Sequence, residues 1–173
     1  MSGHTLTQEE LFCLQGCRTY KQYCGMRKTF ETGSCTFCEL DRVSHDVLWE
    51  DENVYAWMCP EAYMREELKM HIIIAPKRHV RFTTDLSDDE ILSIHHAKQS
   101  IREEYGYQGG LDHVREGDMS LNAGTVPHLH YNIFEPNCSG EARIPLFKDP
   151  SDRGKNVERA SVFARWYEDG NIP

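Results

Sequence analysis

Two histidines and an asparagine alternate with apolar residues between His128 and Phe134. A period of two is the spacing of a half-buried β-strand, so His128, His130 and Asn132 would share one face, with apolar residues filling a core behind it. Neighbours on one face lie roughly 6.6 Å apart, which allows a common pocket but not three ligands on one small ion. The alternative is a strand with a merely hydrogen-bonded polar face, but burying unpaired polar groups costs free energy. The pattern indicates one face for packing and one for chemistry.

A second candidate site is the pair Cys35 and Cys38, which follows a break at residues 32–34. A Cys-x-x-Cys in a tight turn presents two thiolates to one tetrahedral ion, usually zinc, and needs two further ligands. Taken alone the pair could equally be a redox dithiol, although no thioredoxin-like strand and helix surround it. The chain has seven cysteines, an odd number, and the absence of a secretion signal argues against a disulfide framework.

Four further segments are expected to build a sheet with the strand from His128 to Phe134: Val47–Glu50, Val54–Met58, Met70–Ala75 and Asp118–Asn122. The first two flank a polar turn and read as a hairpin. Pro76 would stop the third strand, and the residues before it, 61–69, would form a short helix or loop. The fourth is expected to pair with the 128–134 strand through the turn at residues 123–125.

A capping box predicts a helix that begins after Ser87, because Glu90 stands three residues later. The helix should run to about Tyr105 and pack on the sheet. Its expected buried stripe is Ile91, Ile94, Ala97, Ile101 and Tyr105. His95 and His96 point in different directions on such a helix and are interpreted as structural or surface residues.

The two ends of the chain are expected to be helical. In the N-terminal helix, over about residues 7–30, Gly16 and Gly25 should cause a kink or a split. Its cysteines are interpreted as small core residues rather than a second metal site: Cys13, Cys17 and Cys24. A break at Pro150–Gly154 should precede a closing helix over 156–169. We expect a single α+β domain over residues 1–173, with a helical extension (1–34), a core (35–135) and a C-terminal extension (136–173).

Composition excludes some functions. The net charge is −9, with 28 acidic against 19 basic residues, which argues against the basic footprint that nucleic acid requires. No apolar run approaches the length of a membrane span, and residues 1–10 lack the regions of a signal peptide. We therefore expect a cytoplasmic protein with no membrane or nucleic-acid partner.

These motifs, in this order, resemble the histidine triad (HIT) family. The Cys-x-x-Cys pair is followed by the hairpin, by the His-apolar-Pro-Lys-x-His block from His71 to His79, and by the lead-in 123–127 with the triad itself. The resemblance implies a HIT-like fold of about five mainly antiparallel strands with a packed helix, and a homodimer. It also implies that zinc, as in the branch with galactose-1-phosphate uridylyltransferases, is held by Cys35, Cys38, His79 and His128. Two thiolates and two imidazoles close a tetrahedral shell, so this zinc would be structural.

The resemblance further implies that His130 is the nucleophile, which attacks the α-phosphorus of a nucleoside 5′-phosphate derivative to form a nucleotidyl-histidine. Asn122 would lie near the α-phosphate, although Asn-Ala-Gly is also ordinary turn chemistry. The expected substrate contacts are Ser120, Asn122, Gly124 and Thr125, and the expected catalytic residues are His130, Asn132 and Asn122.

The third triad position is Asn132 instead of histidine. An amide donates and accepts hydrogen bonds but cannot shuttle a proton at neutral pH, so transfer to a phosphate-type acceptor is expected to be faster than transfer to water. Dinucleoside polyphosphates, nucleotide sugars and phosphoramidates remain candidate substrates. The alternative is a zinc-stabilised nucleotide-binding module without turnover. It is favoured by Met58–Pro60 where relatives often carry a ribose-binding aspartate, by Met70 where they have glycine, and by the lack of a glutamine before the triad.

Overall fold

The computed structural model describes residues 5–122, 124–141, 144 and 150–171. The chain divides into two compact units. The first comprises Met1–Thr36, Gly117–Pro127 and Pro145–Pro173, and the second Phe37–Glu116 and His128–Ile144. Each unit is described by itself, and the expectation of one domain over the whole chain stays a prediction.

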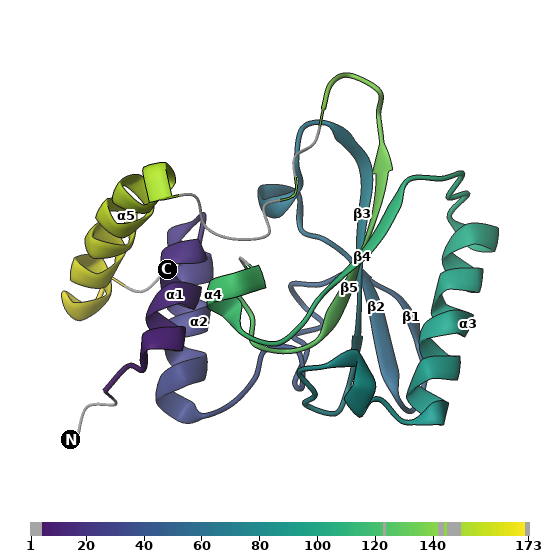
Figure 1. The fold of residues 1–173 in the computed structure, drawn as a ribbon, viewed down its shortest axis with the longest axis horizontal. Coiled ribbons are helices and arrows are strands. Elements are labelled where there is room, and N and C mark those ends of the chain that lie inside the picture. The colour runs from purple at the N-terminus through teal and green to yellow at the C-terminus, as the bar shows by residue number, and fades with distance from the viewer. Residues whose placement is uncertain (1–4, 123, 142–143, 145–149, 172–173) are drawn as a thin grey trace. The chain divides into compact units, whose positions relative to one another are not determined.

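The second unit is built on a five-stranded sheet (Figure 1). Its strands are β1 Val47–Glu50, β2 Val54–Met58, β3 Leu68–Pro76, β4 Leu111–Arg115 and β5 His130–Pro136. They lie in the order β1-β2-β3-β5-β4, and each neighbouring pair is antiparallel. Short 3₁₀ turns, Glu61–Tyr63 and Thr83–Asp85, flank β3 along the chain. The predicted hairpin and the predicted α+β class are confirmed.

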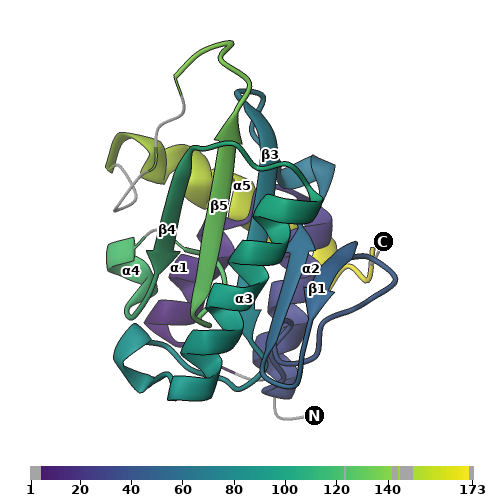
Figure 2. The same cartoon turned by 90° about the vertical axis from the view of Figure 1, so that its right-hand side faces the viewer.

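Helix α3, Asp88–Glu104, covers one face of this sheet (Figure 2). Ser87 and Glu90 form the predicted capping box. Ile94, Ala97 and Ile101 are buried against apolar residues of the strands: Val54, Ala56, Met70, Ile72, Ile74 and Ile133. Burial of this apolar surface is what fixes the helix on the sheet.

The predicted stripe of α3 was wrong at both ends. Ile91 is 50% exposed and Tyr105 is 37% exposed, whereas Glu90 is only 4% exposed. The helix is rotated so that Glu90 turns inward, because its carboxylate accepts hydrogen bonds from Arg78. His95 and His96 are exposed, as expected.

The partner of the triad strand was also predicted wrongly. Residues Met119–Asn122 form a short helix, α4, in which the amide of Asn122 donates to the carbonyl of Asp118, and the strand beside β5 is β4. The chain enters β4 through Gly110, where an added Cβ would lie 1.8 Å from the carbonyl oxygen of Phe134. Only glycine allows this close approach. The triad strand itself begins at His130, so His128 lies just before it.

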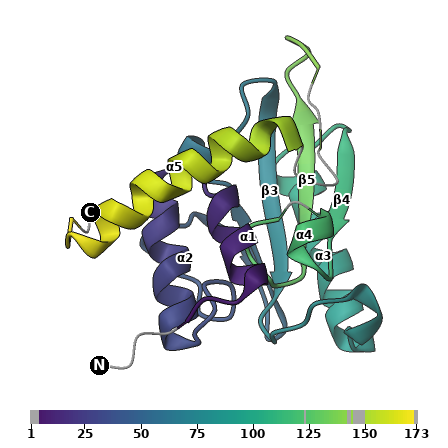
Figure 3. The ribbon, with the colours of Figure 1, turned by 60° about the vertical axis from the view of Figure 1, so that its left-hand side comes forward.

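The first unit is helical and contains α1 Gln8–Gly16, α2 Tyr20–Thr32, α4, and α5 Pro150–Glu168 (Figure 3). The chain splits after Gly16 as expected, but Gly25 lies within α2 without a break. Cys13, Cys17 and Cys24 are buried, as predicted. The predicted break at 150–154 was wrong, since α5 begins at Pro150, a residue well suited to a first helical turn. Every helix in the described residues is too short or too polar to pass through a bilayer.

Candidate metal centre and histidine site

The structure brings the four predicted metal ligands together. One ligand atom from each of Cys35, Cys38, His79 and His128 lies within 4.8 Å of the others. Cys38 Sγ is 3.5 Å from Nδ1 of His79 and 3.6 Å from Nδ1 of His128. Cys35 and Cys38 belong to one turn, His79 follows β3, and His128 precedes β5.

These distances fit a zinc ion. A tetrahedral shell with Zn–S of about 2.3 Å and Zn–N of about 2.05 Å has S–N edges of about 3.6 Å. The separations from Cys38 Sγ to Nδ1 of His79 and of His128 are 3.5 and 3.6 Å. Two thiolates and two imidazoles are also the donor set that zinc prefers in closed structural sites. Cys35, Cys38, His79 and His128 can therefore hold zinc without leaving a position for substrate.

The ring of His128 is oriented by the backbone. Its Nε2–H donates to the carbonyl of Pro76 over 2.9 Å, which directs Nδ1 toward Cys38. The amide of Leu129 donates to the carbonyl of Val80 over 2.8 Å, so the segments after β3 and before β5 are joined. Burial, aided by the charge of His79, lowers the pKa of His128 to about 4. The imidazole is neutral at neutral pH, as ligation requires.

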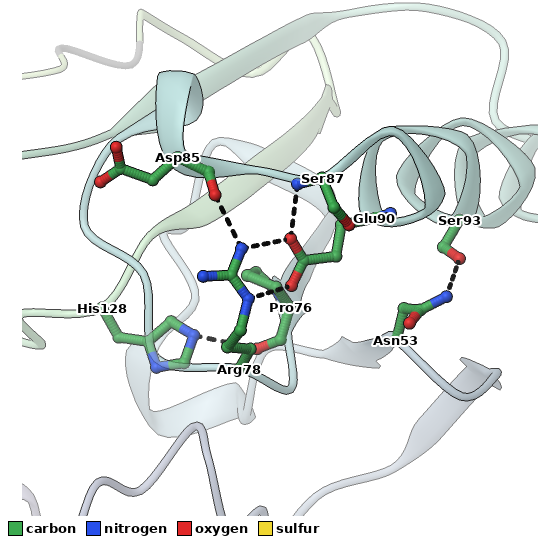
Figure 4. A network of polar contacts seen from close by, with 8 residues as sticks. All are labelled: Asn53, Pro76, Arg78, Asp85, Ser87, Glu90, Ser93 and His128. Atoms are coloured by element: carbon green, nitrogen blue, oxygen red, sulfur yellow. Dashed lines mark hydrogen bonds and ion pairs between the residues drawn. The ribbon is translucent and has the colours of Figure 1, made fainter.

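An ion pair between the exposed side chain of Arg78 and the buried carboxylate of Glu90 supports the segment that carries His79 (Figure 4). Arg78 donates from Nε and Nη2 to Glu90 over 3.0 and 2.7 Å, and from Nη2 to the carbonyl of Asp85. Burial alone would raise the pKa of Glu90, but the hydrogen bonds from Arg78 and from the amide of Ser87 outweigh it and lower that pKa. The pair connects the start of α3 to Arg78, which adjoins the candidate metal ligand His79.

Arg78→Met is expected to lower the free energy of unfolding by about 2 kcal/mol, because it leaves the carboxylate of Glu90 buried without its partner. Arg42→Met is the matched control, since Arg42 binds Glu50 through two similar bonds at the surface. That loss should stay below about 1 kcal/mol. Urea denaturation of the zinc-loaded proteins measures both, and equal losses would contradict the assignment.

His130 is fixed in one tautomer. Its Nδ1–H donates to the carbonyl of His128 over 2.7 Å, so the lone pair is on Nε2. Phe37, between the two cysteines, packs its ring edge-on against His128 and His130, with centroids 5.8 and 5.3 Å away. Burial lowers the pKa of His130 to about 4, so the ring is a neutral base at neutral pH.

Asn132 shares this sheet face with His130. Its Oδ1 accepts a hydrogen bond from Nε2 of His71 over 3.0 Å, which leaves Nδ2 as the donor end of the amide. Among the described residues, Nδ2 of Asn132 is buried without a hydrogen-bond partner. Such an atom suits an oxygen acceptor on a bound ligand.

Two residues of β4 lie on this face, although neither was predicted as a site residue. His113 is paired across the sheet with Asn132, and Arg115 with His130. No strand was predicted for residues 111–115, which are only five residues long and follow two glycines. His71 was recognised only as part of a block, and its contact with Asn132 depends on the register between β3 and β5.

His113 should make stability depend on pH. In the folded protein the pKa of His113 is lowered to about 4, mainly by burial and secondly by the positive charge of Arg115. In the unfolded chain it is about 6.5. The unfolded chain then binds more protons between pH 6.5 and 4, so the contribution of His113 is lost as the pH falls, by up to about 1.4 kcal/mol per pH unit. The unfolding free energy of His113→Gln should therefore fall less steeply than that of wild type in this window. If the unfolding free energies of wild type and His113→Gln change equally with pH, the assignment to His113 is wrong.

The four predicted substrate contacts lie in the first unit. Ser120 and Asn122 are in α4, and Oδ1 of Asn122 accepts from the amide of Gly124 over 2.7 Å. Oγ1 of Thr125 is 3.5 Å from Nε2 of Gln22. The contact of Asn122 with Gly124 is ordinary Asx-turn geometry. The roles of these four residues toward a substrate stay predictions.

Comparisons with known proteins add a distant relative. No family model matches the chain. A HIT-like protein of Methanocaldococcus jannaschii is 24% identical over 134 residues, which are 75% of this chain and 95% of the relative. Among solved structures, a HIT family hydrolase from Clostridium thermocellum is 22% identical over 64% of this chain and 96% of its own, with a TM-score of 0.47. A zinc-bound histidine triad family protein from Mycobacterium smegmatis is 19% identical over 80% and 99%, with a TM-score of 0.43.

The match to the M. jannaschii protein covers 95% of that protein. In this chain the ordered motifs come together as a four-ligand cluster beside His130. The chain is thus similar to a HIT-like protein over 75% of its length, and it carries a Cys-x-x-Cys pair at residues 35–38. Its triad is the variant His128-x-His130-x-Asn132.

Proposed function

We propose that this protein is a nucleotidyltransferase or nucleotide hydrolase in which His130 attacks the α-phosphorus of a nucleoside 5′-phosphate derivative. The observation that supports this most is the hydrogen bond from Nδ1–H of His130 to the carbonyl of His128, at 2.7 Å. It holds the lone pair on Nε2, the atom that must act as nucleophile. The imidazole of His130 is also uncharged at neutral pH, because its pKa is lowered to about 4, and nucleophilic attack requires the uncharged ring.

The reaction has two steps. In the first, the lone pair of Nε2 forms a bond to phosphorus while the bond from phosphorus to the leaving group breaks and that group departs with the electron pair. In the second, an acceptor oxygen attacks the same phosphorus and the Nε2–P pair returns to the ring. Asn132 Nδ2 is suited to donate a hydrogen bond to a phosphoryl oxygen during both steps.

The metal has a supporting role in this proposal. Zinc held by Cys35, Cys38, His79 and His128 would supply rigid coordination and no open position for chemistry. The carbonyl of His128 is what the nucleophile contacts, so fixing this residue fixes the direction of Nε2 in His130.

The test is a covalent adduct. The zinc-loaded protein is mixed with dinucleoside polyphosphates, nucleotide sugars and nucleoside phosphoramidates carrying adenine, guanine or uracil. Intact-mass measurement after rapid denaturation should find the mass of one nucleoside monophosphate added, and peptide mapping should place it on His130. Binding without adduct or product across the panel would instead support the non-catalytic zinc-stabilised nucleotide-binding module. An adduct that persists in His130→Ala would refute the nucleophile.

The acceptor should be decided by Asn132. Water must lose a proton to attack well, whereas a phosphate already carries negative charge, and an amide moves no proton at neutral pH. Added phosphate or sugar phosphates are therefore expected to capture the nucleotide in preference to water. Asn132→His should shift the products toward the free monophosphate. If water is the sole acceptor and this substitution changes nothing, the protein is a hydrolase.

A further inference from the structure

Arg115 is the cross-strand neighbour of the candidate nucleophile. It ends β4, His130 begins β5, and the two residues are directly paired in the antiparallel register. Residues paired in this way point to the same face of the sheet, with Cβ atoms about 4.5 to 5.5 Å apart. The guanidinium of Arg115 is one of the causes that lower the pKa of His130 and of His113, which agrees with its placement on this face.

The charge of the site gives this arginine its importance. A phosphate that is attacked by a neutral imidazole keeps its negative oxygens and needs compensating charge nearby. A zinc ion bound by two thiolates has no net charge to offer. The described neighbours of His130 on its face, namely Phe37, His113 and Asn132, are neutral at pH 7. An arginine keeps its charge at any physiological pH and matches two phosphoryl oxygens at once.

We propose that Arg115 binds the non-bridging oxygens of the phosphate that His130 attacks, and so sets a preference for substrates with an anionic phosphate at that position. The inference rests on the proposed function for the identity of that phosphate. Arg115 then acts from β4 while Asn132 donates from β5, so the phosphate is held between two adjacent strands.

The test compares nucleosides with their monophosphates. Affinities of the zinc-loaded protein for adenosine, guanosine and uridine, and for AMP, GMP and UMP, are measured by calorimetry with wild type, Arg115→Met and Arg115→Lys. Arg115→Met should weaken monophosphate binding by about 10- to 100-fold, and nucleoside binding by less than about 2-fold. Arg115→Lys keeps the charge but loses the paired donors, so its loss should be smaller.

Arg102→Met is the matched control, because Arg102 is exposed on α3, and α3 covers the opposite face of the sheet. It should leave all affinities unchanged, and zinc content and thermal unfolding should verify that each variant is folded. Should Arg115→Met not fold, an unchanged monophosphate affinity in Arg115→Lys together with unchanged adduct rates overturns the proposal.

The outcomes separate this inference from the proposed function. The role of Arg115 is overturned if Arg115→Met binds the monophosphates as tightly as wild type does. It is also overturned if wild type binds each monophosphate no more tightly than the matching nucleoside. Both conclusions hold even if His130 carries the adduct. Phosphate-dependent binding that is lost with Arg115, in a protein that forms no adduct, supports the role of Arg115 and overturns the covalent reaction.

Discussion

His130→Ala is expected to reduce turnover by about ten-thousand-fold or more and to abolish the covalent adduct. In the proposed reaction His130 is the nucleophile, because the hydrogen bond from Nδ1–H to the carbonyl of His128 leaves the lone pair on Nε2. Removal of that nucleophile would leave only the contribution of substrate binding. Steady-state rates on the substrate that forms adduct fastest, together with intact-mass measurement, give both readouts.

Two variants separate chemistry from folding in this experiment. His95→Ala removes an exposed histidine of α3 and should retain wild-type turnover. His130→Asn keeps a polar side chain at the buried position and should remain folded but inactive. Turnover within about tenfold of wild type in a folded His130→Asn protein would show that another group is the nucleophile.

Loss of the metal should have the largest effect on stability. Cys38 Sγ lies within 3.6 Å of both imidazoles, so Cys38→Ser is expected to remove the ion and to lower the free energy of unfolding by on the order of 5 kcal/mol. Cys35→Ser should behave alike. Metal analysis of the wild type should give about one zinc per chain.

The control for metal loss is Cys138→Ser, because Cys138 is exposed and lies outside the four-ligand cluster. Its zinc content and thermal unfolding should match the wild type, and a chelator should destabilise this control as it does the wild type while leaving Cys38→Ser almost unaffected. A wild type purified without metal and equally stable would remove the structural role of the cluster.

Local signals predicted much of the molecule. The capping box at Ser87 and the hairpin from Val47 to Met58 were correct because each depends on residues that lie close together in the chain. The four proposed ligands come together as the family resemblance implied, although Cys35 and His128 are 93 positions apart in the numbering. Ordered motifs carry such long-range information, which residue propensities alone do not.

The errors arose where distant contacts outweigh local preference. Strand β4 forms because its backbone pairs with that of β5, whereas its own five residues have no strong strand pattern. Glu90 is buried in place of Ile91 because Arg78 donates hydrogen bonds to its carboxylate, and the sequence does not reveal this contact. His113 and Arg115 were missed with β4, so the site face was predicted incompletely.

The side chain and the backbone carbonyl of His128 have two different roles. The ring of His128 faces the cysteines, while its peptide oxygen accepts a hydrogen bond from Nδ1–H of His130. In the proposed reaction, the link between a bound ion and the nucleophile would be a peptide plane, and the ion would affect the chemistry through the direction of the His128 C=O bond. A redesigned protein that held residues 128–129 in place by apolar packing could dispense with metal and still present the same tautomer of His130. Under the proposed mechanism, metal dependence and catalytic competence should therefore be separable by engineering.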